Sequence, residues 1–165
     1  MFNTIEPEEF EEMLHNQFAD NIVYVGKQYD ISEAEITLDK IKDAIQWMKE
    51  QGFTFLTSCN GIHYPHTEKV FCMVYHLYNM QRNLRVRLKV SNPIDPPHFP
   101  TITDIFPAAN WMEREAYDFC GFKFDGHPDL RRILNEDSME GWPLRKEYPL
   151  EDQARFDKDD KMFGR

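Results

Sequence analysis

Apolar side chains recur at helical spacing near the start of the chain, and a β-branched run follows them. Residues 7–18 carry one apolar stripe, which predicts a short amphipathic helix. The stripe consists of Phe10, Met13, Leu14 and Phe18. The run NIVYVG at 21–26 is rich in β-branched and aromatic residues, and it predicts a strand.

A second helical pattern begins near Thr37, whose hydroxyl can cap a helix N-terminus. Gly52 is placed to end this helix, a common position for glycine. The apolar positions between them are Leu38, Ile41, Ala44, Ile45 and Met48. Ser32 and Glu35 also form a possible capping box, so an earlier start of the helix is the alternative.

Three strand patterns follow, at 53–59, 70–78 and 84–90. The last one alternates strictly, which predicts a half-buried strand with apolar side chains on one face and a solvated basic face on the other. The short link between the last two predicts an antiparallel hairpin. With the helices, these strands predict an α+β fold: a small, mostly antiparallel or mixed sheet with helices on one face, followed by an extended C-terminal segment.

Four prolines fall within residues 92–100, NPIDPPHFP, and they exclude a helix or a central strand there. We therefore expect the compact body to end at this point. The predicted organisation is an α+β body with an acidic N-terminal helix at 1–91, a proline-rich link at 92–107, a helix and turn region at 108–134, and an extended partner-binding tail at 135–165.

Beyond the link one further helix is predicted, and Gly121 ends it. Its apolar stripe is Ala108, Met112, Ala116, Phe119 and Cys120. The following FKF predicts an aromatic hairpin, and Pro128 is placed at the first position of another helix, with Asp129 near its positive end. The tail has little periodicity but many apolar anchors, so we expect it to lie on another surface. The anchors are Trp142, Leu144, Tyr148, Leu150, Phe156 and Phe163.

The 165-residue chain has a net charge of −10, and its first 26 residues hold six acids without lysine or arginine. One domain with a tail is expected at this length. An acidic protein neutralises phosphates poorly, which disfavours nucleic-acid binding. The N-terminus lacks the pattern of a signal peptide, and no apolar run approaches the ~20 residues of a membrane span. We therefore expect a cytoplasmic chain whose association with a membrane is indirect.

Patterns for metal binding and catalysis are weak. His63 and His66 have an i,i+3 spacing, but no zinc-finger pattern surrounds them. Cys59, Cys72 and Cys120 lie far apart and cannot alone supply the four ligands of a usual iron–sulfur cluster, which predicts reduced thiols. Cys120 lies on an apolar stripe and is expected to be inert. The sequence contains no GxSxG, GxGxxG or Walker loop.

Residues 113–134, EREAYDFCGFKFDGHPDLRRIL, gather histidine, arginine and carboxylates. On a helix, Arg114 and Asp118 are i,i+4 neighbours, and a salt-bridged surface is the simplest interpretation. Exposed ion pairs contribute only ~0–1 kcal/mol each, which is a weak reason to gather so many charges. Arginine together with aromatic residues is typical of a protein–protein contact core, so an interface is favoured. The alternatives are a free-standing enzyme using Glu115, Asp118 and His127 as acid and base, and a nucleic-acid module on the basic strand.

This stretch, followed by EGWPLRKEYPL at 140–150, strongly resembles the signature of the 30 kDa peripheral-arm (C-type) subunit family of proton-translocating NADH:quinone oxidoreductase (NDH-1, respiratory complex I). The family pattern falls on Glu113, Arg114, Glu115 and Asp118, on Gly126 to Leu134 and on Pro143 to Pro149. The resemblance extends over 38–150. The departures, which concern local packing, are Cys120, Met139, Trp142 and Glu147.

The resemblance implies a non-catalytic structural and assembly subunit of the quinone-reducing module, in a translocase that carries electrons from NADH through FMN and iron–sulfur clusters to quinone. It implies no cofactor in this chain, with FMN and the clusters in partner subunits. The implied partners are the hydrogenase-large-subunit-like (49 kDa type) subunit and the subunit carrying the terminal iron–sulfur cluster. The implied location is peripheral, on the cytoplasmic face of the inner (plasma) membrane.

Related complexes supply the alternative: an equivalent subunit of a membrane-bound hydrogenase, a formate hydrogenlyase, or a ferredoxin- or F420-linked dehydrogenase. In each case we expect no catalytic, cofactor-binding or metal residue in this chain, and an interface for partner subunits instead. The expected interface residues are Glu113, Arg114, Glu115, Asp118, His127, Asp129, Arg131, Arg132, Trp142, Arg145, Lys146 and Tyr148. Of these, Arg114, Arg131, Arg132 and Trp142 are the expected hot spots.

Overall fold

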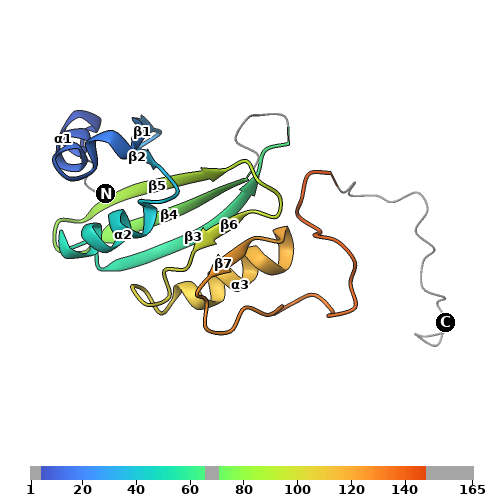
Figure 1. Cartoon of the computed structure of the whole chain (residues 1–165). Helices are drawn as coiled ribbons and strands as arrows, with labels where there is room; N and C mark the ends of the chain where they lie inside the picture. Colours follow the sequence, from blue (N-terminus) through green and yellow to red (C-terminus); the bar gives the residue numbers. More distant parts are fainter. Residues whose placement is uncertain (1–4, 66–70, 148–165) are drawn as a thin grey trace.

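The structure is a computed structural model of the chain, and it describes residues 5–65 and 71–147 (Figure 1). The helices are α1 (Pro7–Phe18), α2 (Ile41–Glu50) and α3 (Ala109–Cys120), with a short 3-10 helix at Ala19–Asn21. The strands are β1 (Ile22–Gln28), β2 (Ile31–Ile36), β3 (Phe55–His63), β4 (Phe71–Asn79), β5 (Leu84–Asn92), β6 (His98–Pro100) and β7 (Lys123–Asp125). The predicted α+β fold is confirmed.

Five strands form one mixed sheet in the order β1-β2-β5-β4-β3. β2 and β5 run parallel, and the other neighbours are antiparallel, including the predicted hairpin of β4 and β5. β6 and β7 form a separate two-stranded sheet. β1 and β3 are therefore the two edges of the large sheet.

β2 is the strand that the sequence patterns missed. Ser32 and Glu35 lie within it, so the alternative capping box is wrong. The buried Ser32 hydroxyl donates a hydrogen bond to the Ile5 carbonyl, and Ala34 and Ile36 are buried on the same face of the strand. Because β2 pairs with β1 on one side and β5 on the other, the sheet rather than local propensity makes this segment a strand.

The helices cover the sheet face that carries the leucine and valine side chains of β5. The core residues of α1 are Phe10, Leu14 and Phe18, and those of α2 are Ile41, Ala44, Ile45 and Met48. Phe18 meets Trp47 edge-on with ring centroids 5.8 Å apart, which joins the two helices. In Figure 1, α2 lies in front of the sheet, and α3 is drawn below β3.

α2 begins four residues later than its predicted cap. Residues 37–40 form a turn in which the Lys40 N–H donates to the Thr37 carbonyl at 3.1 Å, and the Thr37 hydroxyl bonds to Asn21 at 3.3 Å. Gly52 follows the helix with a φ of +92°, the left-handed conformation expected of a helix stop.

The opposite face of β5 is less solvated than predicted. Arg87 and Lys89 both pair with Glu33 of β2, at 2.9 and 2.8 Å. Arg87 also donates to His76 of β4 at 2.8 Å, and His76 bonds to Ser58 of β3 at 2.9 Å. Burial, together with the neighbouring cations, lowers the pKa of His76. The basic side chains therefore belong to a polar network that runs across the sheet.

The proline-rich link packs against the body, and its Asp95–Pro96 peptide bond is cis. Phe99 stacks on Phe122 with centroids 5.4 Å apart, and Phe71 of β4 meets Phe122 at 5.6 Å. One cluster of buried side chains includes residues from both sides of the link. The core therefore continues past residue 92, while the division of the chain into four segments stays a prediction.

β7 contains Lys123 and Phe124 of the FKF run, but the predicted aromatic hairpin is wrong. β7 pairs in parallel with β6, so that Phe124 lies opposite Phe99 of the link. A parallel pair needs a long connection, and here α3 supplies it. The link and the segment after α3 are thus joined through their backbones.

α3 ends at Gly121, whose φ is +76°, as predicted. Its stripe faces β3: Ala116 and Cys120 are buried and Met112 and Phe119 are partly buried, whereas Ala108 precedes the helix and is exposed. Among the helices of the described residues, none combines the length and the hydropathy that a bilayer crossing requires. The charged side chains of α3 are where the candidate site begins.

Candidate functional site

Residues 127–147 follow β7 without forming a helix or a strand, and we call this segment the strap (Figure 1). The helix predicted to start at Pro128 is therefore wrong. Side chains of α3 bind backbone groups of the strap that a helix would have satisfied internally. The strap is a fixed irregular segment because α3 supplies its hydrogen-bond partners.

Asp118 is the main anchor of the strap. Its carboxylate accepts the backbone N–H groups of Ile133, Leu134 and Asn135 at 3.1, 2.8 and 3.0 Å. The Asn135 side-chain amide adds a bond to the same carboxylate at 3.0 Å. Burial alone would raise the pKa of Asp118, but these donors outweigh it, and the pKa lies below its usual value. Asp118 is therefore a charged acceptor at neutral pH.

Arg114 holds the strap one turn earlier. Its guanidinium donates to the carbonyls of Arg131 and Arg132 at 3.1 and 3.2 Å and lies over the Trp111 ring, 4.8 Å from its centroid. The ion pair predicted between Arg114 and Asp118 is thus replaced by bonds from each residue to the strap backbone. Both charges serve the attachment of the strap.

Arg132 and Trp142 organise the middle of the strap. Arg132 donates to the carbonyls of Glu136 and Met139 at 3.0 and 2.9 Å, which closes a turn, and it lies 5.2 Å from the centre of the Trp142 ring. Trp142 in turn lies directly against Gly121, where a Cβ atom would come within 2.6 Å of its indole. The end of α3 thus needs a glycine both for its φ and for the space that Trp142 fills.

Arg145 fastens the far end of the strap. It is buried, donates to the Cys120 carbonyl at 2.8 Å, and forms a two-bond pair with Asp95 of the link at 2.9 Å for each bond. Burial alone would lower the pKa of Arg145, but the hydrogen bonds and the charge of Asp95 outweigh it, and the pKa lies above its usual value. Beside it, the Lys146 N–H donates to His63 Nδ1 of β3 at 3.1 Å. The strap therefore ends on the link and on the sheet.

Glu113 lies at the near end of the strap and is fully buried. Its carboxylate accepts the Thr101 hydroxyl at 2.6 Å and the Ile102 N–H at 2.8 Å, and His127 Nε2 lies 3.9 Å away. Burial raises the pKa of Glu113 to about 7, and the two hydrogen bonds only partly oppose the rise. This carboxyl group therefore exchanges its proton near neutral pH.

The twelve predicted interface residues fall into two groups and one outlier. Glu113, Arg114, Asp118 and Arg145 are buried within this chain. A partner would reach these four only through the side chains that cover them, so their role inside the fold is to hold the link and the strap. The side chain of His127 is also fully buried, beside Glu113. The partly or fully exposed group is Glu115, Asp129, Arg131, Arg132, Trp142 and Lys146. Tyr148 lies outside the described residues, and partner contact by the exposed group stays a prediction.

Three residues that complete the site were not predicted from the sequence: Thr101, Asn135 and Asp95. Thr101 and Asp95 lie 12 and 50 residues from their partners along the chain, and no local pattern connects such pairs. Asn135 follows the RRIL segment directly, which is the one weak signal in the sequence. Pairings of this kind follow from the tertiary fold.

The thiols and histidines give no metal site among the described residues, where no group of three potential ligands is found. Cys59, Cys72 and Cys120 are free and buried, and burial raises the pKa of each. His63 is buried and stacks on Phe71 with centroids 4.8 Å apart. His66 lies outside the described residues.

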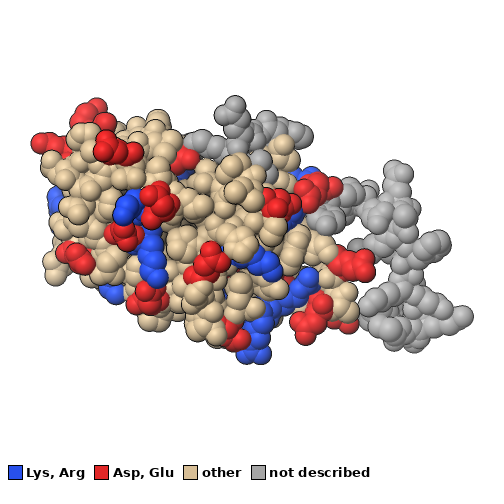
Figure 2. Space-filling model, viewed as in Figure 1, with Lys and Arg blue, Asp and Glu red and all other residues tan. Residues whose placement is uncertain are grey.

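Exposed apolar side chains lie along α3 and the strap. They are Trp111, Leu134, Met139 and Leu144, with exposed fractions of 64%, 72%, 38% and 58%. In the view of Figure 2, basic and acidic side chains interleave over this region, whereas acidic ones gather over α1. Apolar side chains presented on a fixed backbone within a charged rim are typical of a surface that binds another protein.

The fold and the strap together define a class of protein: an α+β domain that carries a preformed irregular segment with an exposed apolar surface. Comparison with known proteins identifies the family. The model of the family described as "Respiratory-chain NADH dehydrogenase, 30 Kd subunit" matches residues 34–154. The chain belongs to this family, as its signature predicts.

Relatives named as the C-type subunit of NADH-quinone oxidoreductase match much of the chain. The protein of Methylobacterium radiotolerans is 50% identical over 107 residues, which are 64% of this chain and 49% of that protein. The protein of Maricaulis maris is 38% identical over 142 residues, covering 81% of this chain and 70% of the relative. The chain thus spans about half the length of the first relative and more than two thirds of the second.

Two solved structures share the fold. The trypsin-resistant fragment of Nqo5 is 28% identical, with a TM-score of 0.65, and the match covers 73% of this chain and 98% of the fragment. A chain of the membrane-bound sulfane sulfur reductase, described as an archaeal respiratory membrane complex, is 27% identical, with a TM-score of 0.75 over 92% of this chain and 95% of that one. The second structure shows the same fold in a different respiratory complex.

Proposed function

We propose that this chain is a non-catalytic structural and assembly subunit of the peripheral arm of proton-translocating NADH:quinone oxidoreductase, in its quinone-reducing module. The observation that carries the proposal is the clamping of the strap by Asp118, Arg114 and Arg145. A segment fixed in this way displays its apolar side chains without an ordering cost at association. The family name and the relatives from NADH-quinone oxidoreductase support the same role.

In this role the strap docks on neighbouring subunits and the electron carriers lie elsewhere. The partners proposed are the 49 kDa-type subunit and the subunit with the terminal iron–sulfur cluster, and the location is the cytoplasmic face of the membrane. FMN and the clusters belong to partner subunits.

The alternative rests on the likeness to the sulfane sulfur reductase chain. An equivalent subunit of a related membrane-bound hydrogenase, formate hydrogenlyase, or ferredoxin- or F420-linked dehydrogenase would have the same fold and the same need for a docking strap. These complexes differ in their electron donor, which lies outside this chain. The neighbours of the chain therefore decide between the two functions.

Gentle extraction from the native membrane, followed by purification through this chain, tests the proposal. Co-purification of a flavin subunit, iron–sulfur subunits and membrane subunits, with NADH:quinone reductase activity, is the expected result. Recovery of a complex without the flavin and NADH-oxidising subunits would favour the alternative. Recovery of the chain only as a free monomer would contradict both.

A further inference from the structure

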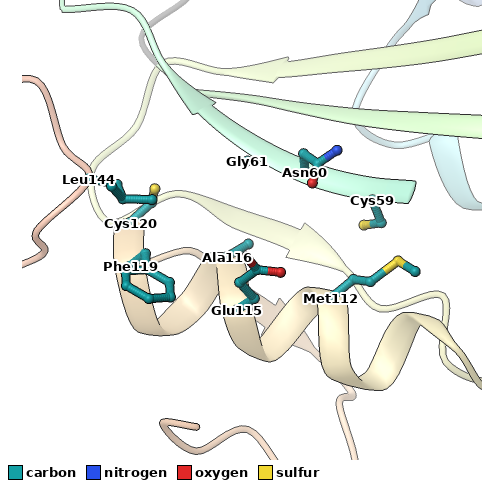
Figure 3. A pocket seen from close by; sticks show the side chains of 9 residues that line it. All are labelled: Cys59, Asn60, Gly61, Met112, Glu115, Ala116, Phe119, Cys120 and Leu144. Carbon is teal, nitrogen blue, oxygen red and sulfur yellow. The ribbon is translucent and has the colours of Figure 1, made fainter. Parts of the chain in front are cut away.

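A small cavity opens between β3 and α3, beside the strap (Figure 3). Its volume is about 100 Å³, which is the space of about three water molecules. It is lined by Cys59, Asn60 and Gly61 of β3, by Met112, Glu115, Ala116, Phe119 and Cys120 of α3, and by Leu144 of the strap. A cavity of this size admits one slender side chain and excludes an indole ring.

The cavity lies at an open edge of the sheet. β3 is the last strand in the order and pairs only with β4. The strap reaches one end of this strand, where the Lys146 N–H bonds to His63. The part of β3 before Gly61 therefore keeps one side of its backbone without a neighbouring strand among the described residues. An unpaired edge of this kind can accept an extended segment of another chain.

The walls of the cavity are apolar. Met112, Phe119 and Leu144 supply carbon and sulfur surfaces. Burial disfavours the charged form of the Cys59 and Cys120 thiols and raises the pKa of each. Cys59 is the more deeply buried of the two, at 2% exposed against 5%. An alkyl chain would lie against such walls without losing hydrogen bonds.

The polar groups of the cavity are Glu115 and Asn60. Both residues are exposed, and the Glu115 carboxylate makes no hydrogen bond or ion pair with any described residue. Figure 3 shows Glu115 on the side of α3 that faces β3, together with Ala116 and Met112. This free carboxylate contrasts with Glu113 and Asp118 on the same helix, whose bonds within the chain are complete.

We propose that the cavity takes a lysine or arginine side chain from an extended segment of a partner subunit, which pairs with the free edge of β3. The alkyl stem fills the apolar cavity while the cation meets the Glu115 carboxylate, as amphipathic cations do at such boundaries. Glu115 is the one charged side chain among the described lining residues, so the lining favours a cation over an anion. The inference rests on the proposed role of the chain as a subunit.

A photo-crosslinking amino acid at Asn60, in the complex extracted from native membranes, tests the proposal. The same group at Val23, an exposed residue on the opposite edge strand β1, is the matched control. We expect the Asn60 probe, but not the Val23 probe, to capture a partner-subunit segment that contains lysine or arginine. Capture of a second copy of this chain, of a segment without a basic residue, or of nothing would overturn the proposal.

Glu115→Gln supplies a second readout, with Glu12→Gln as a control that removes one charge from an exposed position on α1. Glu115→Gln is expected to weaken retention of the chain in the complex about tenfold or more, as the loss of a charged hydrogen bond does. Equal retention of the two variants would contradict the proposal. If the wild-type chain co-purifies while the Asn60 probe fails, the docking site is wrong and the proposed function stands. If the wild-type chain does not co-purify with partner subunits, both the docking site and the proposed function are contradicted.

Discussion

Asn135 is joined to Asp118 by three hydrogen bonds. Its backbone N–H and its side-chain amide each bond to the carboxylate at 3.0 Å, and the amide also reaches the Asp118 carbonyl at 3.3 Å. One residue of α3 thereby fixes a point 17 residues further along the chain. A strap without secondary structure gains a defined path from this contact.

Replacement of Asp118 by asparagine should loosen the strap while the sheet stays folded. The amide removes the negative charge. Its oxygen can keep the three backbone N–H groups that Oδ2 accepts, but its NH2 group then faces the Asn135 side-chain amide, which is itself a donor. A loss of about 2 kcal/mol in the free energy of unfolding is expected, as for buried donors that lose a charged acceptor. Hydrogen exchange at residues 133–135 should accelerate, and urea unfolding measures the loss.

The control for this change is Asp129→Asn, which removes an exposed ion pair with Arg131. Its expected effect is within about 0.5 kcal/mol, and exchange at residues 133–135 should stay as in the wild type. Equal effects of the two substitutions would show that Asp118 has no special hold on the strap.

Alanine at Gly121 should cost more than alanine at Gly126, although both glycines have positive φ, at +76° and +84°. A left-handed alanine costs roughly 1–2 kcal/mol at either position. At Gly121 the added Cβ also lies 2.6 Å from the Trp142 indole, whereas at Gly126 its nearest neighbour is Thr101 at 3.5 Å. Thermal unfolding of both variants measures the difference. In a Trp142→Ala background, the loss of stability from Gly121→Ala should fall to that of Gly126→Ala. A larger loss at Gly121 in that background would contradict the contact with the indole.

Lysine at Arg145 should release the far end of the strap. Its ammonium cannot replace the two parallel bonds to Asp95 together with the bond to the Cys120 carbonyl. We expect faster cleavage by chymotrypsin within the strap, whose Leu134, Trp142 and Leu144 sites are the same in the variant and its control, and a loss of about 2 kcal/mol in stability. Lys146→Ala is the matched control, because the strap uses only the backbone N–H of Lys146. A cleavage rate for Arg145→Lys no faster than the control would refute this role.

Stability should decline with pH because of Glu113. Its pKa is about 7 in the folded chain, against an ordinary value of 4.5. The folded state therefore holds a proton that the unfolded state releases, so this contribution is fully present below pH 4.5 and is lost as pH rises through 7. The expected loss is on the order of 3 kcal/mol.

Glu113→Gln should remove that decline, because glutamine cannot ionise and its carbonyl can still accept the Ile102 N–H. Urea unfolding of both proteins between about pH 4.5 and 8 measures the difference in slope. His127, Asp104 and Lys42 surround the site in both proteins, so the comparison isolates the contribution of the Glu113 carboxyl group, including its interaction with these neighbours. Parallel curves would contradict the raised pKa of Glu113.

The fold was predictable wherever apolar side chains recur with a long and regular spacing. The strict alternation of 84–90 predicted β5 and its buried face, and the stripe of residues 7–18 predicted α1. β2 escaped prediction because its segment, ISEAEI, contains a serine that is buried and bonded to the Ile5 carbonyl and two glutamates that pair across the sheet. These partners come from residues 27 to 56 positions away.

The sequence drew attention to the residues of the candidate site, but it did not predict that several of them are buried. The charges of 113–134 were expected on a surface, yet Glu113, Arg114 and Asp118 are buried. A sequence cannot distinguish a solvated helix face from a face covered by a returning segment, because the cover carries no periodic signal of its own. Asp118 and Asn135 illustrate this: the pair exists only because the strap turns back along α3.

The direct test of the docking role uses two exposed strap residues, Arg131 and Leu134, whose side chains carry no part of the clamp. Arg132 is a poorer choice, because its side chain donates to the Glu136 and Met139 carbonyls within the strap. Replacing Arg131 and Arg132 together by alanine would therefore change the strap itself. Arg131→Ala combined with Leu134→Asp should leave the unfolding curve of the isolated chain unchanged within about 0.5 kcal/mol.

The decisive measurement is the amount of this double variant recovered in the membrane-extracted complex, together with its NADH:quinone reductase activity. The expected result is a folded chain that is lost from the complex, with activity falling in proportion. Full incorporation and normal activity of the double variant would contradict the claim that the strap is the surface by which this subunit joins its neighbours.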